Sequence, residues 1–266
     1  MYKRQGKAGA RYRTGALTVR AGYAGGFRAP TMKEKYMRYD MSGFFWIHGS
    51  KDLKAETSHA FNASVEYAKG GYNLNVAANY SLVGDKISTS TPLTAADDPA
   101  YHYVQYINLD HVQVLGVEAA AQGRWMLADQ SMIGARLAYC YTHEEVRGNT
   151  VNQYCPARPH SVNVRVDWDH NVNGWYGLNV ALTGRILSAV DYTSMEMVAP
   201  YVQYDVHNPA YSIWKLQLTN RFKDSVRLNI ALDNLFDYRP RTYYFNSPVT
   251  SGINLMVGVS IDIDKL

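Results

Sequence analysis

Apolar and polar residues alternate in segments that recur along most of this chain. In a typical segment, Val226, Leu228 and Ile230 are separated by Arg227 and Asn229. Successive residues of a β-strand point to opposite faces, so each segment predicts a strand with one apolar and one polar face. The clearest segments cover 17–23, 61–67, 72–82, 162–168, 176–186, 214–221, 226–233 and 253–264. Almost no helical periodicity separates them, which indicates an all-β fold.

The connections between these segments alternate strictly between short and long. Short turns are expected at 14–15, 69–71, 126–130, 170–174 and 223–225, and long connections at 25–57, 88–101, 145–159, 188–209 and 238–251. In an antiparallel meander, this alternation places every short turn at one end of the strands and every long connection at the other. Outer-membrane barrels have this asymmetry, with strands of about ten residues. We therefore predict a transmembrane antiparallel β-barrel.

Aromatic residues beside the short turns agree with a barrel. The chain contains 22 tyrosines, far above the usual share. Trp125, Trp168 and Trp175 lie next to short turns, with Tyr72 and Phe222 at equivalent places. Amphipathic rings at one level form a girdle where lipid meets water, so outer-membrane lipid is an expected partner.

The number of strands suggests part of a larger barrel. About eleven strands are expected, whereas bacterial single-chain barrels have an even number. An odd number that starts within a strand fits the C-terminal part of a longer protein. The last strand ends in Asp264-Lys265-Leu266 rather than on the aromatic residue that commonly ends outer-membrane strands. A soluble β-sandwich is the alternative, but its strands are usually shorter and its connections do not sort by length.

Composition narrows the function classes. The net charge of the 266 residues is +4 and the basic residues are interspersed, so nucleic-acid binding gains little support. No run of about 18 apolar residues predicts a transmembrane helix, and the N-terminus lacks the apolar segment of a signal peptide. Residues 1–5 resemble the translation of a sequencing-library adaptor, or they are an ordinary polar N-terminus. They are left out of the fold prediction, which leaves 6–266 as the domain.

The polar face and the cysteines carry structural expectations. Charged residues on the polar face fit a plugged or water-filled lumen rather than a small filled barrel, where their burial would be costly. They are Arg165, Asp167, Arg185, Lys215, Arg221, Arg227, Asp233 and Asp262. Cys140 and Cys155 flank a loop-like segment. They would staple one hairpin in an oxidising compartment, or they are two unpaired thiols.

The longest connection, 25–57, carries the strongest motifs. Loops of this length are usually functional or disordered. Phe27-Arg28-Ala29-Pro30, followed by a second box with Asp52 and Leu53, resembles the TonB-dependent outer-membrane receptors. The second box departs from the family's Asn-Pro-Asn-Leu form, because Ser50-Lys51-Asp52-Leu53 stands there. Two later segments, 106–118 and 233–238, resemble the family as well, so the likeness covers nearly the whole chain.

The resemblance implies energised uptake of a scarce, large nutrient across the outer membrane of a Gram-negative bacterium. In such receptors an N-terminal plug fills a roughly 22-stranded barrel, and the TonB complex of the inner membrane pulls on a short N-terminal box. Both plug and box are expected upstream of this sequence, so these residues would not transport alone. No intrinsic cofactor is implied. The transported ligand would be haem or another metal chelate.

His48 is the sharpest indication of the ligand. Haem receptors of the family often carry a histidine between the two boxes, and His48 lies there. A neutral imidazole is a good axial ligand for haem iron, and Phe44, Phe45 and Trp46 are placed to stack on a porphyrin. Tyr36 and Tyr39 are further candidates, since a phenolate also binds ferric iron. The alternative is an incidental histidine beside aromatic residues that pack the loop.

Other functions of the same barrel stay open at this point. A siderophore or cobalamin receptor differs only in its ligand, and a passive or saccharide-specific pore would lack plug and TonB box. A barrel enzyme is a further class, but no spacing selects a Ser, His and Asp for catalysis, so no enzymatic activity is expected. Asp97 and Asp98 would contact a cation or a ligand-capturing surface lipoprotein, or they are solvated loop charges.

Overall fold

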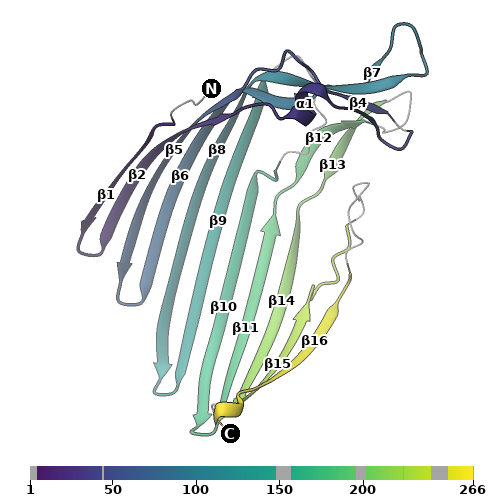
Figure 1. Cartoon of the computed structure of the whole chain (residues 1–266). Helices are drawn as coiled ribbons and strands as arrows, with labels where there is room; N and C mark the ends of the chain where they lie inside the picture. Colours follow the sequence, from purple (N-terminus) through teal and green to yellow (C-terminus); the bar gives the residue numbers. More distant parts are fainter. Residues whose placement is uncertain are drawn as a thin grey trace.

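A computed structural model describes residues 5–43, 45–147, 157–195, 202–223, 225–240 and 251–265. Nearly all of the regular structure in these ranges is β-strand (Figure 1). The exceptions are a short helix, α1 (Met32–Tyr36), and a terminal 3₁₀ turn, η1 (Ile263–Lys265). No helix in these ranges is long and apolar enough to cross a membrane.

Eleven strands follow one another through a curved antiparallel sheet in the order of the chain (Figure 1). They are β1 (Lys7–Thr14), β2 (Leu17–Arg28), β5 (Glu56–Lys69), β6 (Tyr72–Thr89), β8 (His102–Ala128), β9 (Ser131–Arg147), β10 (His160–Asn173), β11 (Tyr176–Leu187), β14 (Tyr211–Phe222), β15 (Val226–Asp233) and β16 (Asn254–Ile261). The expected number of strands and the meander are therefore confirmed.

The short turns all lie at one end of the strands and the long connections at the other (Figure 1). The turn between β5 and β6 shows why the short ones are possible. Its two residues, Gly70 and Gly71, have φ of 59° and 86°. Two-residue hairpin turns of this type need positive φ at both positions, which glycine adopts without a steric penalty.

One face of the sheet is apolar and exposed. The strand register places Tyr23, Phe61, Tyr80 and Leu115 side by side across four strands. The same face continues to β16, where Val257 is 63% exposed and Val259 62%. A continuous exposed apolar surface on a curved sheet is the surface that a barrel presents to lipid.

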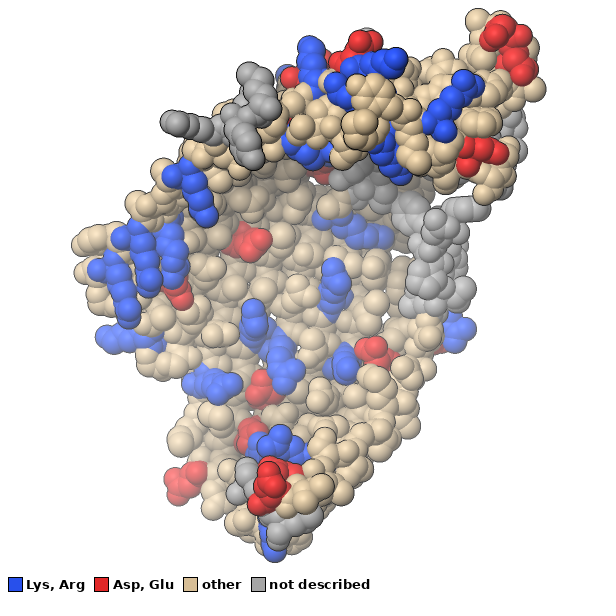
Figure 2. Space-filling model, viewed as in Figure 1, with Lys and Arg blue, Asp and Glu red and all other residues tan. Residues whose placement is uncertain are grey.

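The opposite, hollowed face is polar. Figure 2 shows charged side chains scattered over it. Arg221 binds Asp169 through two hydrogen bonds of 2.8 and 3.0 Å, and Arg165 contacts Asp167 at 3.2 Å. The register places Arg185, Lys215, Arg227 and Asp233 on the same face, as expected. Asp262 follows the end of β16.

Aromatic rings gather near the short turns on the apolar face. Tyr72 meets Trp125 edge-on at 5.8 Å between ring centroids, and Trp175 stacks on Phe222 at 6.5 Å. Trp168 stacks on His170 at 5.4 Å. The rings therefore lie at one level, as a girdle requires.

Three of the expected long connections are shorter and more ordered than the pattern indicated. Strand β2 continues through Gly25 and Gly26 to Arg28, because its backbone pairs with β5 over its whole length. The connection 29–55 contains α1, β3 (Arg38–Asp40) and β4 (Trp46–His48). The other two contain β7 (Leu93–Thr94) and the hairpin of β12 (Val190–Met195) and β13 (Gln203–Asn208). Strand β16 ends at Ile261, two residues before the end of the apolar run.

Candidate functional site

The connection 29–55 is anchored at its start by a helix with a capping box. Thr31 Oγ1 accepts a hydrogen bond from the Glu34 amide at 3.2 Å, and Glu34 Oε2 accepts one from the Thr31 amide at 2.6 Å. Together they satisfy two backbone donors that a helix start leaves free. The later part of the loop folds back onto this helix, because the Gly49 amide donates to Met37 O and the Ser50 amide to Glu34 O.

Arg28 ties this helix to the sheet. It donates two hydrogen bonds of 2.7 Å to Glu56, the first residue of β5, and one of 2.8 Å to Glu34. Glu56 also accepts from the Ile87 amide at 2.8 Å. The expected motif residue Arg28 is thus a structural link between β2, α1, β5 and β6. Phe27 is the residue before it in β2, and Ala29 and Pro30 lead from the strand to the helix.

The charge of Glu34 is stabilised in this arrangement. Burial alone would raise the pKa of Glu34, but hydrogen bonds from Thr31 and Arg28 and the Arg28 charge outweigh it, and the pKa lies below the usual carboxyl value. At neutral pH the carboxylate therefore holds both the helix start and the end of β2.

The second box is also structural. Leu53 is 6% exposed, in contrast to the exposed Asp52 before it. The next residue, Lys54, exchanges two backbone hydrogen bonds with the Asn108 side chain, at 2.8 and 3.1 Å. Asn108 Nδ2 also donates to Asp85 O at 2.7 Å. Asn108 lies in the family-like segment 106–118. It therefore joins the end of the connection 29–55 to β6 and β8.

The hairpin β3–β4 brings His48 into a cluster with residues at the start of β8. Arg38 lies opposite His48 in the hairpin, and β4 pairs in parallel with the start of β8. Tyr103 stacks on His48 at 4.6 Å between ring centroids, and Tyr101 stacks on Trp46 at 5.9 Å. We call Arg38, Trp46, His48, Tyr101 and Tyr103 the His48 cluster.

Two hydrogen bonds meet on the Tyr101 hydroxyl. Arg38 Nη2 donates to it at 2.6 Å, and it lies 2.8 Å from His48 Nε2. The Arg38 guanidinium also lies over the rings of Trp46 and Tyr101, 5.4 Å from each centroid. Burial and the Arg38 charge lower the pKa of His48, which favours the neutral imidazole.

The structure places the other expected ligand residues differently. Tyr39 pairs with Ile47 and so lies on the hairpin face opposite Arg38 and His48, where Lys33 lies 5.1 Å from its ring centroid. Tyr36 lies on α1 and is 57% exposed. Phe45 is half-buried next to Trp46, and Phe44 lies outside the described residues. The hairpin therefore unites His48 with Trp46, but not with Tyr39.

Sequence reasoning missed Arg38, Tyr101 and Tyr103. Tyr101 lies just before β8 and Tyr103 within it, and their alternation is an ordinary strand pattern. The contact of Tyr101 with His48 spans 53 residues, and the cluster depends on the parallel pairing of β4 with β8. No local pattern in the chain indicates that pairing.

The described residues include no group of three His, Cys, Asp or Glu side chains that could hold a bare metal ion. A chelate brings most of its own donor atoms, so this result does not bear on the ligand expected here. Cys140 lies on β9 with its sulfur 3.7 Å from Thr142 Oγ1. Cys155 lies outside the described residues, so the Cys140–Cys155 disulfide stays a prediction.

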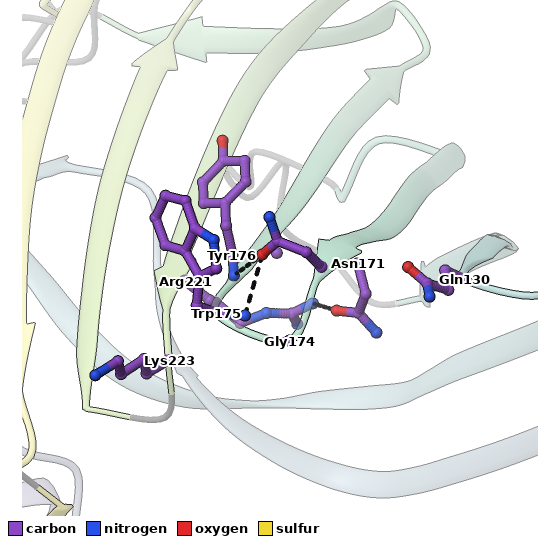
Figure 3. A pocket seen from close by; sticks show the side chains of 9 residues that line it. Gln130, Asn171, Gly174, Trp175, Tyr176, Arg221 and Lys223 are labelled. Carbon is purple, nitrogen blue, oxygen red and sulfur yellow. Dashed lines mark hydrogen bonds between the residues drawn. The ribbon is translucent and has the colours of Figure 1, made fainter.

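A cavity lies at the opposite end of the sheet, beside the β10–β11 turn. It has a volume of about 370 Å³ and polar lining residues that include Gln130, Asn171 and Arg221. Figure 3 shows Asn171, Trp175 and Arg221 around it, with Arg221 donating to Asn171 at 3.2 Å. Its location at the short-turn end separates it from the His48 cluster.

Comparisons with known proteins agree with the fold and the motifs. A family model described as "TonB dependent receptor-like, beta-barrel" matches residues 4–235. An iron-regulated outer membrane virulence protein of Vibrio cholerae is 27% identical over 235 residues, which are 83% of this chain and 33% of that protein. A probable hemoglobin and hemoglobin-haptoglobin-binding protein 3 of Haemophilus influenzae is 30% identical over 135 residues, 49% of this chain and 12% of that protein.

Among solved structures, the FrpB iron transporter from Neisseria meningitidis has a TM-score of 0.70 at 14% identity. The match covers 97% of this chain and 39% of that one. At this identity the match shows a shared fold. The chain spans about a third of the length of the curated Vibrio relative.

Proposed function

Since the chain belongs to the TonB-dependent receptors of the outer membrane, we propose that it is part of a receptor for an iron chelate, and that the chelate is haem. The observation that carries the proposal is the His48 cluster. It holds an imidazole and a phenol beside the rings of Trp46 and Tyr103, at the end of the sheet that carries the long connections. Imidazole and phenolate are axial ligands of haem iron, and flat rings stack on a porphyrin.

The names of two relatives support an iron chelate. The Vibrio relative is named as iron-regulated, and the Haemophilus relative as binding hemoglobin. Hemoglobin carries haem, so a haem ligand connects these names with the residues of the cluster.

For the whole receptor we propose the partners of its family. TonB would supply the energy, and a plug domain would lie against the polar, hollowed face of the sheet. Paired charges such as Arg221 and Asp169 suit such an interface, because each is already neutralised within the sheet. A surface lipoprotein that delivers the ligand would meet the exposed loop with Asp97 and Asp98.

A siderophore is the second candidate ligand. The connection 29–55 exposes the basic residues Lys33, Lys51 and Lys54. At this end of the sheet, Figure 2 shows basic side chains beside acidic ones. Clustered positive charge attracts anionic ferric siderophores and speeds their encounter. Cobalamin and a passive pore for saccharides have no comparable support in the described residues.

Haem titration of the full-length receptor tests the proposal. We expect wild-type protein to shift the Soret band at low haem concentration, and His48→Ala to weaken binding at least tenfold. His207→Ala is the matched control, since His207 lies on the separate β12–β13 hairpin and pairs with Asp191. Wild-type protein that binds a ferric siderophore but no haem would select the second candidate.

A further inference from the structure

Three arginines from neighbouring strands surround a cavity on the polar, hollowed face of the sheet. The cavity has a volume of about 280 Å³, and its lining residues include Arg124 of β8, Arg136 of β9 and Arg165 of β10. We call these three residues the arginine cluster. The register places Gln122 opposite Arg136 and Arg136 opposite Arg165, so the cluster extends across three adjacent strands.

One carboxylate lies beside this cluster. Arg165 Nε donates to Asp167 Oδ1 at 3.2 Å, and the two side chains are 43% and 28% exposed. The Asp167 carboxylate lies over Gly134 of β9, because a Cβ added at Gly134 would come within 2.9 Å of Asp167 Oδ2. Glycine at this position therefore leaves the space that the carboxylate occupies. Among the residues that line the cavity, three guanidinium groups share this single carboxylate.

Two members of the cluster have no counter-charge. Arg124 and Arg136 make no hydrogen bond or ion pair with any residue that the structure describes. Arg136 and Arg165 are direct partners in the register, and like charges in this position destabilise a pair of strands. The sheet by itself therefore leaves an unfavourable concentration of positive charge at the cavity.

Other acids of the same face do not neutralise the cluster. Glu66 and Asp169 each bind an arginine outside it, at 2.7 and 2.8 Å. Glu118 is opposite Cys140, which lies four residues along β9 from Arg136. Four residues of a strand span about 13 Å. A favourable partner for the cluster must therefore come from outside the described residues.

The location of the cluster indicates what this partner is. In the whole receptor the hollowed face would line the inside of the barrel, where the proposed plug excludes water. A charge that is enclosed without a partner is costly. The cost would persist for as long as the receptor is folded, so a ligand that passes through does not remove it. A carboxylate of the receptor itself does, and a guanidinium binds it with two parallel hydrogen bonds.

We propose that the arginine cluster binds an Asp or Glu side chain of the plug, an inference that rests on the plug of the proposed function. Arg124 and Arg136 supply the free guanidinium groups, and Arg165 stays with Asp167. The plug is therefore acidic where it meets β8, β9 and β10. The cavity is the space that the side chain of the plug enters.

Zero-length cross-linking of the full-length receptor tests this inference. Arg136→Lys keeps the charge and introduces an amine, which a carbodiimide couples to a carboxylate in contact with it. Mass spectrometry should then find an amide bond between position 136 and an Asp or Glu of the plug. Arg227→Lys, at a basic residue of the same face outside the cluster, is the matched control and should give no such bond.

Amide hydrogen exchange of the plug gives a second readout. Neutralising Arg124→Gln and Arg136→Gln together should accelerate this exchange tenfold or more in full-length receptor, whereas Arg227→Gln should leave it near wild type. A bond from position 136 to Asp167 alone, with unchanged plug exchange, would overturn the inference.

A free anion is the alternative occupant of the cavity. Inorganic phosphate that raises the unfolding temperature of wild type but not of the double variant, without a cross-link to the plug, would assign the cluster to a free anion and also overturn the inference. The haem titration is a separate measurement. Receptor that binds no haem but forms the cross-link would refute the haem proposal alone, and receptor that binds haem without the cross-link would refute this inference alone.

Discussion

The hydrogen bonds of Arg28 to Glu34 and Glu56 offer a direct test of how the connection 29–55 is held. Replacing Arg28 with Ala removes three charge-assisted hydrogen bonds and leaves the carboxylates of Glu34 and Glu56 without their counter-charge. Their side chains are 13% and 16% exposed, so water compensates only part of the loss. Hydrogen bonds to charged groups contribute about 1.5–3 kcal/mol each. Arg28 itself is 42% exposed, which reduces that sum.

A net cost of about 2 kcal/mol corresponds to roughly a 30-fold increase in the open population of the loop. Amide hydrogen exchange measures this population directly. The reporting amides are those of Gly49 and Ser50, whose acceptors are Met37 O and Glu34 O near α1. Their exchange in full-length receptor should accelerate by this factor. Arg28→Lys should lie between wild type and Arg28→Ala, because an ammonium cannot bridge both carboxylates with a planar fork.

Arg147→Ala is the matched control. Arg147 makes one hydrogen bond of 2.7 Å to Glu145, and the two side chains are 59% and 42% exposed. Such pairs contribute at most about 1 kcal/mol. If Arg28→Ala leaves the Gly49 and Ser50 amides as protected as Arg147→Ala does, the family motif does not anchor the loop and the reasoning is refuted.

Two further predictions concern the same loop and the wall of the sheet. Because the pKa of Glu34 is lowered, its stabilisation is complete above the ordinary carboxyl pKa of about 4.3 and is lost as the pH falls through the lowered value. Ser50 exchange, corrected for its intrinsic rate, should therefore rise in acid, and Glu34→Gln should remove that dependence. Leu182→Arg on the apolar face should destabilise the folded receptor in lipid vesicles by about 2–4 kcal/mol. Gln217→Arg on the polar face, where the neighbours across the sheet are Ala181 and Ala231, should cost much less. Equal losses in urea titrations would contradict the assignment of the faces.

The strands and the two faces of the sheet can be predicted from the sequence, because the alternation that indicates them involves only neighbouring residues. A period of two fixes which residues share a face, so Val257 and Arg227 were assigned to opposite faces before any pairing was known. The turn residues Gly70 and Gly71 likewise indicate a hairpin by their own conformational freedom. Strand ends were less certain, because Gly25 and Gly26 resemble a loop yet pair with β5.

The loop is different because its structure depends on contacts between distant segments. The family motif pointed to 25–57, but nothing near Arg28 indicates that its partners are Glu34 and Glu56, and nothing near His48 indicates Tyr101. The parallel pairing of three residues of β4 with β8 brings Tyr101 to His48, and Arg38 follows because it lies opposite His48 in the hairpin. A histidine found by its place between two motifs is thus joined to a phenol and a guanidinium that no motif contains. The surroundings of His48 therefore depend on the folded loop, and a search for single loop histidines would find neither Tyr101 nor Arg38.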